Sequence, residues 1–140
     1  MEKLEKENGM EKLMLETLME QQREYFASGA TLPVKVRMEA LSRLEKALQK
    51  QEQILCKALH TDLGKSKTES VMCEIGLVQG EIRWMKQHLG RLCRTKHVRT
   101  PLAQFAAKSY QSPSPYGNVL IMSPWNYPVL LPLLLNHLQG

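Results

Sequence analysis

The sequence is poor in cysteine, in aromatic residues and in long uninterrupted apolar runs. Its three cysteines, Cys56, Cys73 and Cys93, lie 17 and 20 residues apart with no C-x-x-C pair, which excludes a dense disulfide framework and gives no indication of zinc. The four histidines lack partners at i, i+4 spacing that could share a metal on one helix face. We therefore expect no metal site, a reducing compartment and a structural role for all three cysteines.

The chain also lacks a recognisable secretory signal. Its N-terminus, "MEKLEKENGMEK", alternates acidic and basic residues and has no apolar core of about seven or more residues. The one membrane-like stretch, "VLIMSPWNYPVLLPLLL" at residues 119–135, is interrupted by Asn126, Pro124, Pro128 and Pro132 and falls short of a spanning helix. We expect a cytoplasmic protein with no membrane contact from this segment.

Charge and composition are those of an ordinary globular domain, with 43% hydrophobic and 24% charged residues over 140 positions. A net charge of +5 raises the hypothesis of a nucleic-acid or anionic-membrane partner. The basic residues are, however, interspersed with acidic ones through residues 1–96, as on the solvated faces of helices. We therefore expect no nucleic-acid partner.

Hydrophobic spacing predicts three helices within residues 1–99, and we treat these residues as the N-terminal helical part of the chain. Asn8 is a candidate N-cap for the first, with Glu11 three residues later, and Gly29 ends it. The second begins near Pro33 and ends at Gly64, which is free to adopt a left-handed conformation. Their apolar stripes are Met10, Leu13, Met14, Leu18 and Tyr25 in the first, and Leu41, Leu44, Leu48, Leu55 and Leu59 in the second.

The third helix carries the clearest signal, because Ser66 and Glu69 form an S-x-x-E capping box before a long apolar stripe. We interpret the stripe as core packing rather than a methionine-lined ligand groove, since methionine commonly fills irregular gaps. The basic tail "RLCRTKHVR" suits the C-terminal end of this helix. The stripe consists of Met72, Ile75, Val78, Ile82, Met85, Leu89 and Leu92.

From residue 100 the pattern changes to strands and turns. Residues 100–117 read as an extended β segment broken by prolines and reversed at Gly117, and "NVLIMS" reads as a buried strand. Residues 118–140 then form one strand-turn-helix unit of a parallel sheet. A lone unit cannot make a sheet, and the only other extended candidate is residues 109–112. The prediction is therefore an α/β fold that is incomplete at residue 140.

The turn "PWNYP" lies where open α/β sheets bind ligands, beyond the carboxyl end of a strand and before a helix. One interpretation is that Asn126 caps the helix. The other is that Pro128 occupies the first helical position and Tyr127 the cap, which leaves the Asn126 amide available to a ligand. Both interpretations stay open at this level.

Three stretches resemble the N-terminal third of NAD(P)-dependent aldehyde dehydrogenases, in particular their class-three, fatty-aldehyde-type branch. They are "REYFASGAT", "ALHTDLGKSKTESVMCEIGLVQGEI" and "VRTPLAQFAAKSYQSPSPYGNVLIMSPWNYP". The resemblance runs from about Leu13 to Pro128. It implies that the helices and the extended segment pack around a cofactor-binding domain, whose Rossmann-like sheet opens with the strand before "SPWNYP".

The resemblance also implies roles for the turn. Asn126 matches the asparagine whose amide donates to the substrate oxygen when a catalytic thiolate adds to an aldehyde. Tyr127 would lie beside the substrate channel, although an aromatic residue here could equally be core, and Trp125 could equally be simple packing. The residues implied to line the groove for NAD or NADP are Met122, Ser123, Pro124 and Trp125.

In the family, the nucleophilic cysteine, the glutamate base and the residues that hold the adenosine ribose lie further downstream. The resemblance therefore implies the N-terminal part of an enzyme that converts an aldehyde to a carboxylic acid through a thiohemiacetal. We expect this part to be inactive alone, and the full-length enzyme to be a homodimer. The alternative is a non-catalytic helical scaffold that binds another protein through its leucine-rich tail, residues 129–138.

The end of the sequence departs from the family pattern. The family continues its helix into an "AAGN" turn and a second strand, whereas this chain reads "LLLNHLQG". We interpret the ending as a shortened or out-of-frame terminus, which the coding DNA would decide. Asn118, which stands where the family usually has valine or isoleucine, is a minor difference.

Overall fold

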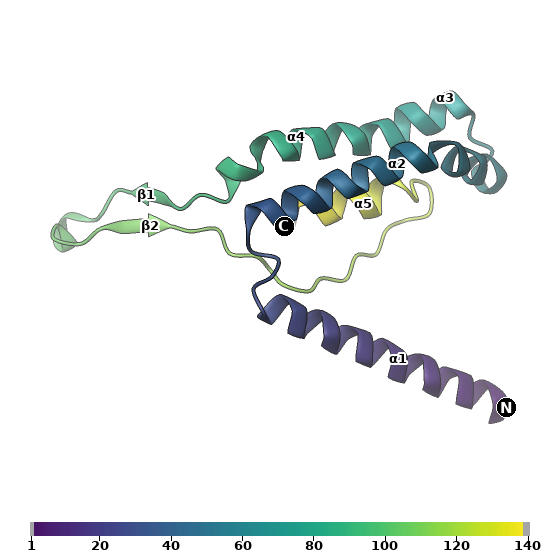
Figure 1. Cartoon of the computed structure of the whole chain (residues 1–140), viewed down its shortest axis with the longest axis horizontal. Helices are drawn as coiled ribbons and strands as arrows, with labels where there is room; N and C mark the ends of the chain where they lie inside the picture. The colour runs from purple at the N-terminus through teal and green to yellow at the C-terminus, as the bar shows by residue number, and fades with distance from the viewer. Residues whose placement is uncertain (1, 139–140) are drawn as a thin grey trace.

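Helices account for most of the chain, because long stretches of leucine, lysine, glutamate and glutamine favour them (Figure 1). The computed structural model describes the backbone of residues 2–138 and the side chains of residues 12–134. Its elements are α1 (Glu2–Ala27), α2 (Val34–Leu63), α3 (Lys67–Ser70), the π-helix η1 (Val71–Ile75), α4 (Gly76–Leu92), β1 (Lys96–Val98), the 3-10 helix η2 (Leu102–Gln104), β2 (Ser109–Gln111) and α5 (Leu130–Leu138).

The core lies where α2, α4 and α5 pack together (Figure 1). Its buried centre is Leu48 of α2 with Val78 and Ile82 of α4. The predicted stripes of the second and third helices are therefore confirmed at their centres, whereas Met72 and Leu92 at the ends of the third stripe are exposed. The partly buried residues packed against the centre are Leu41, Leu44, Leu55, Leu130 and Leu133.

The first helix differs from its prediction. Asn8 lies inside α1 rather than at its start, because the helix runs from Glu2 through a stretch rich in glutamate and lysine, both good helix formers. Figure 1 shows α1 extending away from the other helices. The described part of its apolar stripe, Leu13, Met14, Leu18 and Tyr25, is consequently exposed instead of packed in the core.

Helix boundaries follow the sequence signals closely. Gly29 follows the end of α1, as predicted, with a φ of 73°, and Gly64 adopts the predicted left-handed conformation after α2, with a φ of 68°. Pro33 directly precedes α2. The Glu69 N–H donates to the Ser66 side-chain oxygen at 3.1 Å, which confirms the Ser66 cap.

A β-hairpin projects beyond the helices (Figure 1). Strands β1 and β2 are antiparallel, with Lys96 opposite Gln111, His97 opposite Tyr110 and Val98 opposite Ser109. Strand β2 lies within the extended candidate at residues 109–112, whereas Leu102–Gln104 of the predicted 100–117 β segment form the 3-10 helix η2. The sequence analysis places Lys96–Val98 in the basic tail of the third helix. In the structure that helix ends at Leu92, and Lys96–Val98 form strand β1, which pairs with β2.

The buried strand expected over residues 118–123 is not paired in the structure, and most of these residues are exposed. Within residues 2–138 no second strand lies beside it, so the parallel sheet of the predicted Rossmann-like unit is not formed. A lone strand is unstable because strands are held by hydrogen bonds to neighbouring strands. The described fold is thus helical with a small hairpin.

The leucine-rich tail is not a free surface in this structure. Leu130 and Leu133 of α5 pack against the core formed by α2 and α4, and residues 129–134 are half-buried. The alternative prediction, a scaffold that binds another protein through an exposed leucine-rich tail, requires these residues to be exposed, and residues 129–134 are not. Within the described backbone, none of the helices combines the length and apolarity that a bilayer crossing needs.

One helical irregularity was not predicted. Helices α3 and α4 form a continuous run through η1, where the Gly76 N–H donates to the Val71 carbonyl, five residues back. The wider π turn leaves little space beside Gly76: a Cβ added there would lie 2.7 Å from the Val71 oxygen. Glycine is thus required by space, since its own φ of −66° is ordinary.

We expect Gly76→Ala to lower the free energy of unfolding by about 1–3 kcal/mol, because the methyl group overpacks against the Val71 carbonyl. Urea titration followed by circular dichroism measures it. The matched control is Gly80→Ala in the same helix, where nothing lies within 4 Å of the added Cβ and stability should rise by up to about 1 kcal/mol. Equal stability of the two variants would contradict the requirement for glycine.

Candidate functional site

The residues singled out by sequence lie together on an exposed stretch between residue 118 and α5. Met122 is 82% exposed and Trp125 88% exposed, and the Asn126 side chain is also exposed. Ser123 is half-buried, and Tyr127 is 37% exposed. Their backbone is available as well: among the described residues, positions 118–125 make no hydrogen bond to one another or to the helices.

Asn126 takes part in the structure through its backbone, not its side chain. Its carbonyl oxygen accepts a hydrogen bond from Lys65 Nζ at 2.8 Å, across 61 positions of sequence. The carboxamide makes no hydrogen bond to any residue that the structure describes. It therefore does not cap α5, and its donor and acceptor groups face outward.

The cap of α5 is instead Glu74, from the π-helix η1. Its Oε2 accepts the N–H groups of Val129 at 2.8 Å and Leu130 at 3.3 Å, two of the donors that a helix N-terminus leaves unpaired. Helix α5 begins at Leu130, so Pro128 lies in the turn before it and not at the first helical position that the second sequence interpretation gave it; the Leu131 N–H donates to the Tyr127 carbonyl at 3.2 Å across this turn.

Lys65 and Glu74 form a buried ion pair beneath the turn. Lys65 is 9% exposed and Glu74 is fully buried, and Lys65 Nζ donates to Glu74 Oε1. The ammonium group also lies 4.2 Å from the centroid of the Tyr127 ring, a cation–π distance. Both charges are therefore compensated, by each other and by polar groups of residues 126–130.

Sequence reasoning missed this pair, although one signal pointed to Glu74. Ser70, Glu74, Val78 and Ile82 recur every four residues, and all are fully buried. A carboxylate at the spacing of a core stripe indicates a buried group that needs a partner. Nothing comparable marks Lys65, which follows Gly64 in an ordinary helix-ending turn.

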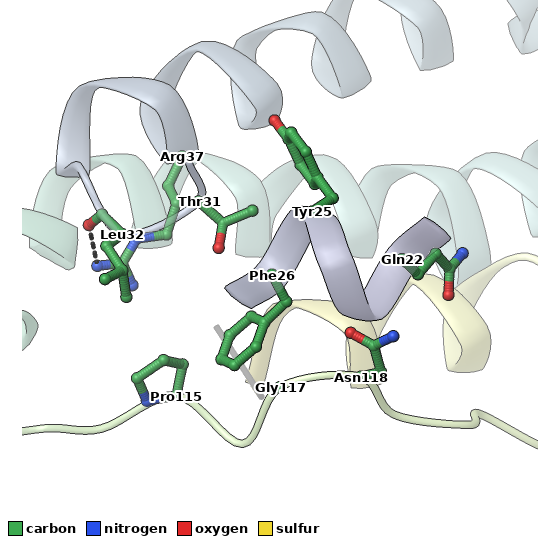
Figure 2. Close-up of a pocket in the computed structure, with 9 residues that line it drawn as sticks. All are labelled: Gln22, Tyr25, Phe26, Thr31, Leu32, Arg37, Pro115, Gly117 and Asn118. Atoms are coloured by element: carbon green, nitrogen blue, oxygen red, sulfur yellow. Dashed lines mark hydrogen bonds between the residues drawn. The ribbon is translucent and has the colours of Figure 1, made fainter. Parts of the chain in front are cut away.

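A second contact holds the other end of the exposed stretch. Gly117 has φ of 90°, and a Cβ added there would lie 3.3 Å from the Phe26 ring. Figure 2 shows Phe26 of α1 directed at the chain between Pro115 and Gly117. The cavity here has a volume of about 280 Å³ and is lined by Gln22, Tyr25, Phe26, Thr31, Leu32, Arg37, Pro115, Gly117 and Asn118.

None of the three cysteines is exposed. Cys56 is buried in α2, whereas Cys73 in η1 and Cys93 after α4 are half-buried, and all three are free thiols. In the part of the chain that the structure describes, no three His, Cys, Asp or Glu side chains are grouped closely enough to hold a metal ion.

Comparison with known proteins adds a family likeness to this geometry. The profile of the aldehyde dehydrogenase family matches residues 6–135. Similar sequences include 4,4'-diaponeurosporen-aldehyde dehydrogenase of Staphylococcus aureus, 41% identical over 107 residues, which are 76% of this chain and 23% of the relative. Human aldehyde dehydrogenase family 3 member B1 is 37% identical over 112 residues, or 80% of this chain and 24% of the relative.

A solved structure agrees with the sequence matches. The substrate-bound state of Staphylococcus aureus AldH superposes with a TM-score of 0.81 at 38% identity, covering 84% of this chain and 26% of that one. Aldehyde dehydrogenase family 3 member F1 of Arabidopsis thaliana is 34% identical over 119 residues, 85% of this chain and 25% of the relative. The chain thus spans about a quarter of the length of the curated relatives it matches.

We expect Glu74→Gln to lower the free energy of unfolding by about 3–5 kcal/mol, because it leaves the Lys65 ammonium buried without a carboxylate. Denaturant titration of the chain measures it. The control is Glu45→Gln, which breaks the partly exposed pair of Glu45 with Lys86 and should cost about 0–1 kcal/mol. If both variants lost the same small amount, the buried pair would not hold the turn.

Proposed function

Because the chain belongs to the aldehyde dehydrogenase family, we propose that it is the N-terminal part of an NAD(P)-dependent enzyme that oxidises an aldehyde to a carboxylic acid. The observation that carries the proposal is the Asn126 carboxamide, which is exposed and makes no hydrogen bond to a described residue, on a turn whose backbone is held by buried charges. Such a group is a preorganised neutral donor, the kind that stabilises an oxygen as it becomes negative.

The chemistry proposed for the whole enzyme begins with addition of a thiolate to the aldehyde carbon. The carbonyl electron pair moves onto oxygen, and Asn126 donates its amide N–H to that oxygen in the resulting thiohemiacetal. Loss of hydride from the same carbon leaves a thioester, and water then releases the carboxylic acid and restores the thiol. We place the thiolate and the base that activates water on polypeptide outside these 140 residues, so the chain alone should be inactive.

The cofactor proposed is NAD or NADP, which supplies the hydride acceptor when bound. The residues that would hold it are Met122, Ser123, Pro124 and Trp125. They fit this role in one respect: their backbone groups make no hydrogen bond within the described residues, and the Trp125 indole is 88% exposed with a free N–H donor. Tyr127, half-exposed beside the turn, is proposed to border the aldehyde channel.

By the same family argument we propose that the full enzyme is a homodimer. The proposal depends on the class-three resemblance and on the similarity to family 3 relatives, not on a contact within this chain.

The test of Asn126 uses a chimera in which residues 13–128 of this chain replace the matching segment of the Staphylococcus aureus relative. We expect NAD- or NADP-dependent conversion of an aldehyde to its acid, and a fall in kcat of about 10²- to 10³-fold in Asn126→Ala, because one oxyanion donor is lost. Asn118→Ala, in the same extended stretch, is the matched control and should keep kcat. Unchanged turnover in Asn126→Ala would rule out the donor role.

Trp125 is tested in the same chimera. We expect Trp125→Ala to raise the KM for the cofactor about tenfold, the effect of losing about 1.4 kcal/mol of binding, with little change in the KM for aldehyde. Steady-state kinetics with varied NAD and NADP measures it. Trp84→Ala, which removes an α4 tryptophan stacked on His88, should leave the cofactor KM unchanged. An equal effect of both substitutions would argue for packing alone at Trp125.

A further inference from the structure

We propose that Lys65 and Glu74 are positioning residues for the Asn126 amide, acting through the backbone of the turn. The inference rests on the proposed function of Asn126 and assigns the geometry of that donor to two side chains far from it in sequence. Lys65 holds the carbonyl of Asn126 itself, and Glu74 holds the N–H groups of Val129 and Leu130. The turn is therefore tied on both sides of Tyr127.

The polar contacts of the Lys65 ammonium and the Glu74 carboxylate point to this role. Lys65 Nζ contacts Glu74, the Asn126 carbonyl and the Tyr127 ring. Glu74 uses one oxygen for Lys65 and the other for the start of α5. Among the described residues, the hydrogen bonds of the two charged groups, apart from the one between them, thus go to the Asn126 carbonyl and to the N–H groups of Val129 and Leu130.

Stability alone is a poor explanation for such a pair. Removing two charges from water is costly, and well-packed apolar residues in their place are often equally or more stabilising. What the two charges add is a firm hold on particular atoms of the turn, because charge-assisted hydrogen bonds are shorter and roughly twice as strong as neutral ones. The comparison within the chain is Lys86 with Glu45, a pair at 2.8 Å that joins α4 to α2 and has no bond to the turn.

Direction matters at an oxyanion donor, because the amide must be aimed at a single oxygen. A displacement of roughly 1 Å at a reacting group can lower a rate about 100-fold. The exposed stretch on one side of Asn126, residues 118–125, makes no hydrogen bond in the described structure and offers no guidance of its own. The buried pair is then the element that sets where the amide lies.

The experiment is a double-mutant cycle in the chimera described above. We expect Lys65→Met to lower kcat about 10- to 100-fold with an unchanged KM for aldehyde, because only the transition state carries the negative oxygen. In a chimera that already carries Asn126→Ala, the same substitution should change kcat by less than about twofold, because the donor it positions is gone. Lys86→Met, the matched control, should leave kcat unchanged in both backgrounds.

A second variant guards against unfolding caused by an unpaired buried charge. Lys65→Met combined with Glu74→Gln removes both charges, leaves an acceptor for the start of α5, and should lose kcat as Lys65→Met does while keeping a cooperative thermal transition.

Two results would overturn the positioning role: an unchanged kcat in either variant, or an equal loss of kcat with and without Asn126. If Asn126→Ala alone leaves turnover unchanged, the proposed function fails first and the positioning role falls with it.

Discussion

The ion pair between Lys65 and Glu74 is the constraint around which the rest of the turn is arranged. Neither charge could stay buried without compensation, and the groups that complete it are the carbonyl of Asn126 and the N–H groups that open α5. The dependence is mutual: the turn supplies hydrogen-bond partners for the buried charges, and the charges fix the position of the turn. The backbone of an exposed loop is thereby held in place by buried contacts, as a preorganised donor requires.

The backbone beneath this pair is itself unusual. Glu74 belongs to the π-helix η1, whose wider turn shifts the register between α3 and α4, and such segments often accompany functional sites. Gly76 makes the wide turn sterically feasible beside the Val71 carbonyl. At the far end of the exposed stretch, Gly117 fits against Phe26 of α1. The segment between residues 117 and 126 is therefore held at its two ends, while its apolar side chains remain uncovered in this chain.

Prediction from sequence succeeded where one periodicity or one cap decides the outcome. The spacing of Leu48, Val78 and Ile82 identified the core, and Ser66 and Gly64 marked helix ends. It failed where contacts with other segments decide the outcome: the described residues of the α1 stripe are exposed, and the strand predicted at residues 118–123 has no partner among the described residues. The turn itself was found by position and resemblance, but its support was not, because contacts across 55 to 61 residues leave no local pattern.

The spacing of the ion pair along the chain also bears on how the protein assembles. Lys65 and Glu74 are nine positions apart and meet within one helix-turn-helix, so they can approach while later residues are still being synthesised. The turn joins them only after a loop of more than fifty residues closes, and the entropy lost on closure grows with loop length. We therefore expect the helical pair α2 and α4 to form first and the segment carrying Asn126 to dock last, onto charges that are already facing each other.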